Sequence, residues 1–178
     1  PNYSARLMCE LVDESGHDWT RLAQAAGVDP ALLENTDAEL TGDEEVRLQR
    51  AFDKAMRRET SAWFTLGFRF RILTMGPLGI AAISAENTDK ALRNAMLFQD
   101  LCPSLLAYGL EYDRGELIAV TADADVVPGD IREQHLERAL SCVPRFLHDM
   151  WQNKSLISHA ETTLRRPDNW CGLSLIHI

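Results

Sequence analysis

The sequence lacks the short motifs that mark most enzyme active sites. It contains no GxSxG nucleophile elbow, no HExxH zinc motif, no Walker phosphate-binding loop and no dinucleotide fingerprint. The two-glycine segment 76–79 (GPLG) is not followed by the Lys-Ser/Thr pair that would hold a phosphate and a metal ion. We therefore interpret this segment as a turn with tight packing. We predict that the chain is not an enzyme and uses no cofactor.

Spacings typical of metal sites are also missing. The four cysteines form no CxxC pair and have no histidine at a ligand spacing, so they are interpreted as isolated thiols of a reducing compartment. These are Cys9, Cys102, Cys142 and Cys171. His148 and Asp149 could suggest an acid–base pair, but adjacent residues of a helix do not face each other. We predict no metal site.

Positive charge is scarce, since 27 acidic residues outnumber 18 lysines and arginines and give a net charge of −9. Such a surface repels the phosphate backbone of nucleic acids, so this chain is a poor binder of DNA on its own. There is no basic segment followed by an apolar run at the N-terminus, and no apolar stretch approaches the ~20 residues of a membrane helix. These absences predict a cytoplasmic protein without membrane contact.

What the chain does have is enough apolar sequence for one ordinary domain, with 46% hydrophobic residues among 178. Helical spacing is clearest in the first third, over residues 4–14 and 18–27 and in a short turn opened by Pro30. Thr41 and Glu44 match a capping box that begins a helix to about Arg58. A further helix begins at Asn87 or Thr88 and stops before Pro103.

Strand signals follow in the second half. Residues 106–112 alternate apolar and polar, Asp113-Arg114-Gly115 make a turn, and 117–121 continue as a β-rich run, which predicts a hairpin. Shorter alternations predict a strand over Phe68, Phe70 and Ile72 and a last strand over 156–164.

Between the hairpin and the last strand, Pro128-Gly129-Asp130 opens a long helix with a kink or restart at Pro144. Its apolar register is Leu136, Leu140, Val143 and Leu147. The fold class expected is α+β: N-terminal helices followed by a small, mostly antiparallel sheet packed against long helices.

Aromatic and arginine side chains gather in the segments around the expected sheet. Core filling is the default role of such aromatics, and strand arginines are usually solvated. A pocket for a small effector is also apolar and aromatic with a few polar groups, and an arginine there could pair with a carboxylate. On this second interpretation the ligand-binding residues are Phe68, Phe70, Arg69, Arg71, Tyr108, Tyr112, Phe98 and Trp151.

Four phrases occur in a distinctive order: 22–30 (LAQAAGVDP), 65–69 (TLGFR), 76–79 (GPLG) and 87–92 (NTDKAL). With this order and spacing the chain resembles the N-terminal domain of AraC-type bacterial transcription regulators, in the branch labelled arabinose-binding-like. The resemblance covers about residues 5–167. It departs from the family pattern at Asp89, where members usually have leucine, and nothing in this chain resembles the paired helix-turn-helix units of the family.

The resemblance implies a domain that senses a small metabolite and forms a homodimer, with DNA bound only by a C-terminal domain absent from this chain. Residues 1–167 would form the sensing domain, and 168–178 continue no earlier periodicity and are interpreted as a non-native or truncated tail. The alternative is a stand-alone small-molecule-binding or dimerisation module without DNA-binding units.

Overall fold

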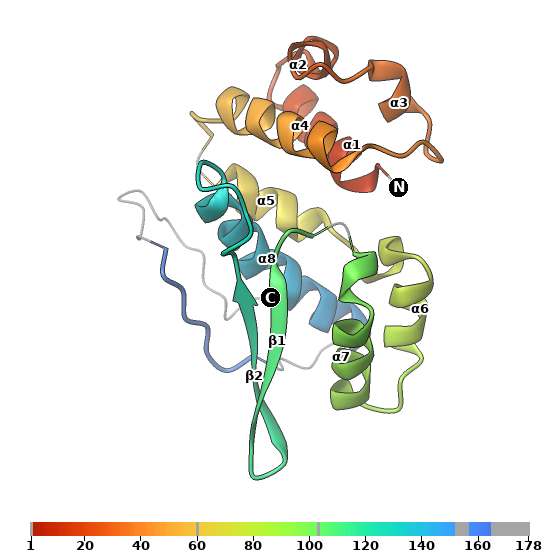
Figure 1. Cartoon of the computed structure of the whole chain (residues 1–178), viewed down its shortest axis with the longest axis vertical. Coiled ribbons are helices and arrows are strands. Elements are labelled where there is room, and N and C mark those ends of the chain that lie inside the picture. The colour runs from red at the N-terminus through yellow and green to blue at the C-terminus, as the bar shows by residue number, and fades with distance from the viewer. Residues whose placement is uncertain (1, 60, 103, 152–156, 165–178) are drawn as a thin grey trace.

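The computed structural model describes residues 2–59, 61–102, 104–151 and 157–164. Within these ranges the chain forms eight α-helices, two short 3-10 helices and one two-stranded antiparallel sheet (Figure 1). The predicted α+β class is confirmed, with helices dominant. None of the helices in the described ranges is long and apolar enough to cross a membrane.

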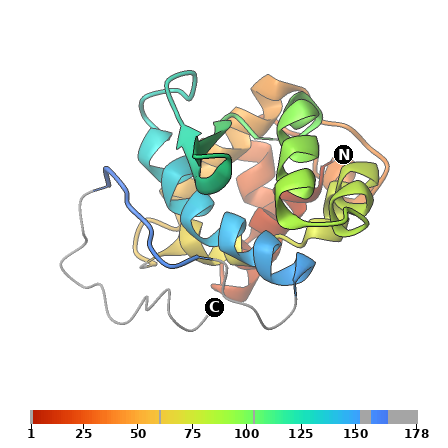
Figure 2. The ribbon, with the colours of Figure 1, turned by 90° about the horizontal axis from the view of Figure 1, so that it is seen from below.

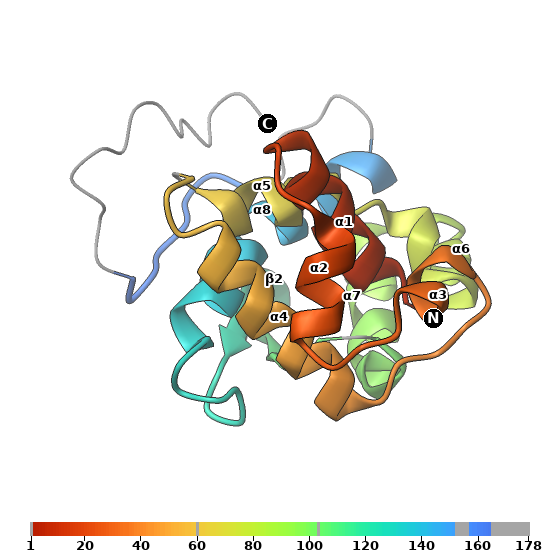
Figure 3. The ribbon, with the colours of Figure 1, turned by 90° about the horizontal axis from the view of Figure 1, so that it is seen from above.

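The N-terminal helices are α1 (Tyr3–Glu14), α2 (Trp19–Ala25), α3 (Pro30–Glu34) and α4 (Gly42–Ala55), and they lie together at one end of the molecule (Figures 1 and 3). Their starts follow the capping signals in the sequence. The Asp18 carboxylate accepts hydrogen bonds from two backbone amides of α2, and Thr41 with Glu44 forms the predicted capping box of α4. Helix α4 ends at Ala55, slightly before the predicted Arg58.

The core of this end is formed by α1 and α4 together with α5 (Ala62–Arg69). Met8, Leu48 and Phe52 are fully buried there. The Phe52 ring meets the indole of Trp63 edge to face, with ring centroids 5.2 Å apart, and the Trp63 indole N–H donates to Asp53. These contacts attach α5 firmly to the N-terminal helices.

Helix α5 also lies along α8 (Arg132–Met150), and the two pack closely at Gly67. The strand predicted over Phe68, Phe70 and Ile72 is therefore wrong. Residues 62–69 are helical, and Ile72–Met75 form the 3-10 helix η1. The segment has helical spacing once Gly67 is counted as part of the buried face, because a glycine in a helix permits close approach of the neighbouring backbone.

Two further helices, α6 (Pro77–Ile83) and α7 (Thr88–Leu97), form a pair on one flank of α8 (Figure 2). Gly76 has a positive φ of 60° and turns the chain, and Pro77 begins α6. Only the start of the segment 76–79 is thus a turn. The tight packing expected of it is observed at Gly79, where a Cβ would lie 1.9 Å from the Ile72 carbonyl oxygen.

The predicted hairpin is confirmed as β1 (Ala107–Asp113) and β2 (Glu116–Asp123), paired antiparallel. Its two-residue turn has positive φ angles at Arg114 and Gly115, as twisted hairpin turns require. A register shift follows Glu111. One end of the hairpin projects away from the helices (Figure 1).

Helix α8 is assigned without a break from Arg132 to Met150, so Pro144 causes no restart. The predicted apolar register is confirmed at Leu147, which is buried, but it does not describe the whole buried face. Leu136 and Leu140 are only partly buried, whereas His135, Arg138 and Ser141 are buried. The strand predicted over 156–164 is wrong for residues 157–164, which form no strand. Its first residue, Leu156, and the predicted tail 168–178 lie outside the described residues.

Candidate functional site

A cavity of about 120 Å³ lies between the hairpin, α7 and α8, and η1 also contributes to its wall. Most of the lining is aliphatic or aromatic. Representative lining residues are Ile72, Leu92, Met96, Val120, Val143 and Leu147. The lining therefore favours an apolar ligand, because a polar group placed there would lose its hydrogen bonds to water without replacement.

Helix α7 presents one face to this cavity. Asn87 caps the helix by accepting a hydrogen bond from the Lys90 amide, and Ala91, Leu92, Ala95 and Met96 then follow on the cavity side. Two of these four residues are alanines. The space that a larger side chain would fill is thus left open beside β1.

The hairpin and α7 are joined by polar contacts outside the cavity. The Tyr112 hydroxyl donates to Asp89 over 2.7 Å, and the Arg93 guanidinium lies 4.5 Å from the centre of the Tyr112 ring. Nearer the cavity, the Gln99 side-chain oxygen accepts from the Tyr108 backbone amide over 3.0 Å. These contacts fix the separation of the two walls.

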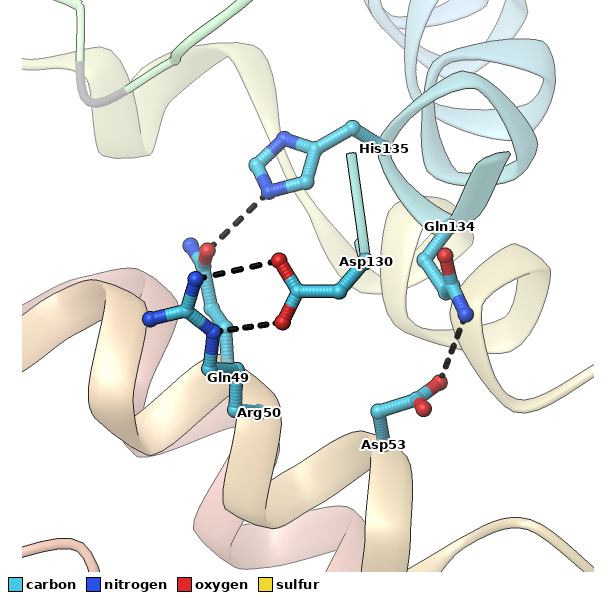
Figure 4. Close-up of polar contacts among 6 residues, drawn as sticks. All are labelled: Gln49, Arg50, Asp53, Asp130, Gln134 and His135. Carbon is cyan, nitrogen blue, oxygen red and sulfur yellow. Dashed lines mark hydrogen bonds and ion pairs between the residues drawn. The ribbon is translucent and has the colours of Figure 1, made fainter. Parts of the chain in front are cut away.

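Helix α8 supplies the charged group of the cavity. Arg138 lines the cavity and is only 5% exposed. Its Nη2 lies 3.3 Å from Nδ1 of His135. Figure 4 shows the other side of the imidazole, where Nε2 of His135 lies 3.0 Å from the Gln49 side-chain oxygen on α4. Because the Gln49 oxygen can only accept, Nε2 of His135 carries the proton and Nδ1 accepts from Arg138.

The titratable groups next to Arg138 are neutral and do not compensate its positive charge. Burial and the neighbouring Arg138 charge lower the pKa of His135 to about 3, so the imidazole is neutral at pH 7. Burial raises the pKa of Tyr108 and of Cys142 to about 12, although the Arg138 charge acts in the opposite direction on both. Both groups are thus also neutral.

None of the ion pairs formed between described residues involves Arg138. One guanidinium nitrogen, Nη1, is buried with no hydrogen-bond partner in the part of the chain that the structure describes. The guanidinium lies 5.6 Å from the centre of the Phe70 ring, which is another part of the lining. A buried guanidinium nitrogen without an acceptor is energetically costly, so Nη1 is a ready donor for a bound molecule.

The sequence of this chain matches a known protein family. Residues 16–170 match the family model of the arabinose-binding domain of AraC transcription regulators, N-terminal. The chain belongs to this family. Two uncharacterised HTH-type transcriptional regulators, from Mycobacterium bovis and Mycobacterium tuberculosis, are each 24% identical over 141 residues. That match covers 79% of this chain but only 41% of the length of either relative. No solved structure matches the chain significantly.

Two of the eight ligand-binding residues predicted from the sequence line the cavity of this AraC-type domain. They are Phe70, at the end of α5, and Tyr108, on β1. They come from segments far apart in the sequence, and the Arg138 guanidinium is near both. The structure therefore brings part of the predicted aromatic cluster together.

The other six predicted residues do not line the cavity. Phe68 and Phe98 are 41% and 47% exposed. Arg69 pairs with Glu14, and Arg71 pairs with Asp149, so both arginines are engaged outside the cavity. The Tyr112 hydroxyl donates a hydrogen bond to Asp89. Trp151 packs beside a small hydrophobic cluster formed by Ile72, Ala82 and Ala91.

Sequence reasoning missed Arg138 and the methionines Met75, Met96 and Met150 of the lining. A usable signal for Arg138 was present. His135, Arg138, Cys142 and Phe146 recur at helical spacing and share a face of α8. An arginine in the middle of a face otherwise formed by cysteine and phenylalanine is a candidate for a buried charge.

A second polar cluster sets the position of α8. The Arg50 guanidinium binds both carboxylate oxygens of Asp130, over 2.6 Å and 3.0 Å, and Gln134 donates to Asp53 over 3.1 Å (Figure 4). The Arg50–Asp130 pair is about half exposed, so it stabilises the fold little and mainly orients the start of α8 on α4.

Histidine, cysteine and acidic side chains are the groups that could hold a metal ion or act as nucleophiles. In the described ranges, no group of three or more histidine, cysteine or acidic residues could hold a metal ion. Cys9, Cys102 and Cys142 are free thiols, and Cys171 lies outside the described residues. Burial raises the pKa of Cys9 to about 12, which makes this thiol inert as a nucleophile near neutral pH.

Proposed function

We propose that this chain is the effector-sensing and dimerisation domain of an AraC-type, DNA-binding transcription regulator of the bacterial cytoplasm. Residues 1–167 form the sensing domain, and DNA is bound by helix-turn-helix units outside this chain. The regulator controls transcription in response to a small metabolite. The cavity between the hairpin, α7 and α8 carries the proposal, because it offers such a molecule an apolar binding site.

The comparisons with known proteins support this function independently of the cavity. The family is defined by the N-terminal domain of AraC regulators, and the two relatives are HTH-type regulators that are much longer than the matched segment. A sensing domain attached to DNA-binding units fits that difference in length.

The size and lining of the cavity limit the effector. A cavity of ~150 Å³ lined by aliphatic side chains is known to hold benzene, so a cavity of about 120 Å³ accommodates an apolar group of similar or slightly smaller size. Met75, Met96 and Met150 can adopt other rotamers to admit a longer chain. A sugar such as arabinose fits poorly, because an apolar wall leaves most of its hydroxyl groups without partners.

Signalling follows from a shift of population. An effector that binds one arrangement of the hairpin, α7 and α8 more tightly than another biases the domain toward the preferred arrangement. A tenfold change in DNA affinity needs only ~1.4 kcal/mol of coupling between the two sites. A buried ligand of benzene size is sufficient for coupling of that magnitude.

Thermal unfolding tests the sensing role. We expect a small apolar ligand at ~100 times its Kd to add ~2.7 kcal/mol to the free energy of unfolding, which raises Tm by roughly 5–10 °C. The variant Ala95→Phe, which fills the cavity, should abolish the shift. Ala81→Phe, at an exposed position of neighbouring α6, should retain it. A panel that leaves Tm unchanged, or shifts it equally in both variants, would contradict the proposal.

Sedimentation of the chain tests dimerisation separately. We expect the sedimentation coefficient to rise with concentration toward that of a dimer. A monomer at all accessible concentrations would remove dimerisation from the proposed function and leave sensing untouched.

A further inference from the structure

Arg138 distinguishes this cavity from an ordinary gap in a hydrophobic core. A small unfilled space in a protein interior is normally lined by apolar atoms alone. Here the wall includes the Arg138 guanidinium, which is 95% buried, and no described residue supplies an acceptor to its Nη1. A buried guanidinium at a cavity surface is the cation of an ion pair that a bound anion could complete.

None of the groups that face Arg138 can serve as the anion of this pair. From β1 it faces the Tyr108 phenol, which forms a hydrogen bond with Ser104, and from its own helix the Cys142 thiol. From α5 it faces the apolar Phe70 ring. Nδ1 of His135, its only unprotonated ring nitrogen, already accepts a hydrogen bond from Nη2 of Arg138. All of these groups are neutral at pH 7.

We propose that the effector is a small monocarboxylate with an apolar body, whose carboxylate pairs with Arg138 while its body fills the space between α7, β2 and α8. This inference rests on the proposed sensing function and names the chemical class of the effector. The planar guanidinium suits a carboxylate because it offers two parallel N–H donors to the two oxygens.

The remaining polar groups of the lining fit the same ligand. Gln99 and Ser104 lie in the wall with Tyr108, but the Gln99 oxygen and Ser104 are both engaged with Tyr108. Apart from Arg138 and the thiols of Cys102 and Cys142, the rest of the wall is apolar. The cavity therefore recognises one charged end and one apolar body, which excludes amino acids, whose ammonium group would lie close to Arg138.

Calorimetric titration of the full chain tests the charge requirement directly. Hexanoate is the probe, with hexanamide and hexan-1-ol as neutral molecules of the same length, and butanoate and octanoate to vary the apolar body. A charge-assisted hydrogen bond to a buried group predicts that hexanoate binds roughly tenfold to hundredfold more tightly than hexanamide.

Substitution of the arginine should abolish this preference. Arg138→Met keeps an apolar side chain of similar length, and we expect it to lose roughly tenfold to hundredfold in hexanoate affinity while retaining hexan-1-ol binding. Arg145→Met is the matched control, because Arg145 lies on the same helix but outside the cavity lining. It should leave the preference for hexanoate unchanged. Circular dichroism confirms that each variant is folded.

The outcomes separate this inference from the proposed function. Equal affinity for hexanoate, hexanamide and hexan-1-ol would overturn the carboxylate assignment, and the cavity would remain a ligand site. This comparison uses the unaltered chain and holds even if Arg138→Met fails to fold. Binding of none of the probes, together with no Tm shift from any small apolar molecule, would overturn both.

Discussion

Replacing Gly67 with alanine is expected to disrupt the closest contact between α5 and α8. An added Cβ would lie 2.2 Å from the Arg138 backbone oxygen and 2.2 Å from the Ser141 Oγ. The Ser141 hydroxyl cannot simply rotate away, because it donates to the Phe64 carbonyl oxygen over 2.6 Å. The Arg138 oxygen belongs to the backbone of α8, so relief requires the two helices to separate.

Three effects determine the size of the loss. Overpacking in a core costs about 1–3 kcal/mol, and breaking the buried hydrogen bond of Ser141 costs about 1–3 kcal/mol more. Alanine offsets about 1 kcal/mol of this loss, because its helix propensity is higher than that of glycine. We therefore expect Gly67→Ala to lower the free energy of unfolding by about 1–5 kcal/mol.

Urea unfolding followed by circular dichroism measures this loss. Gly42→Ala is the matched control, since a Cβ at this first residue of α4 would meet nothing within 4 Å. It should be neutral or stabilise the protein by up to ~1 kcal/mol. The reasoning is refuted if the two variants unfold at the same urea concentration.

Three further predictions concern the N-terminal helices and their contact with α8. Thr41→Ala removes the capping box of α4 and should cost about 1 kcal/mol in urea unfolding, whereas Thr41→Ser should not. His135, whose folded pKa is about 3, stays neutral while the unfolded chain binds a proton below pH ~6.5. Its contribution to stability is thus full above pH ~6.5 and declines by up to ~1.4 kcal/mol per pH unit as pH falls toward about 3. The urea midpoint should follow that slope, and His135→Asn should flatten it. Trp63→Phe leaves Asp53 without the indole donor and should lower the free energy of unfolding by about 1 kcal/mol, so an unchanged midpoint would contradict that hydrogen bond.

Elements defined by local chemistry could be predicted from the sequence. The Thr41–Glu44 capping box and the Asp18 cap depend on residues two or three positions apart, and both are found where expected. The hairpin turn at Arg114 and Gly115 is likewise decided within a few residues. Such signals remain valid in the folded chain because their partners are near in sequence.

The segment around Phe68 shows where local patterns fail. Phe68, Phe70 and Ile72 alternate like a strand, but Trp63, Leu66, Gly67 and Phe70 are spaced like a helix and are all buried. A hydrophobicity pattern gives Gly67 no weight, although its missing side chain permits the contact with α8. The tertiary contact, rather than the alternation, determines the conformation.

Only part of the candidate site could be predicted from the sequence, for a related reason. On α8 the leucines Leu136 and Leu140 are less buried than His135 and Arg138, which reverses the order that hydrophobicity predicts. His135 can be buried because the side-chain oxygen of Gln49, 86 residues earlier in the chain, accepts a hydrogen bond from its Nε2. Arg138 follows on the same face, and only the assembled fold reveals that its Nη1 has no hydrogen-bond partner among the described residues. Because polar burial depends on distant partners, a buried charge at a cavity wall is a property of the tertiary structure.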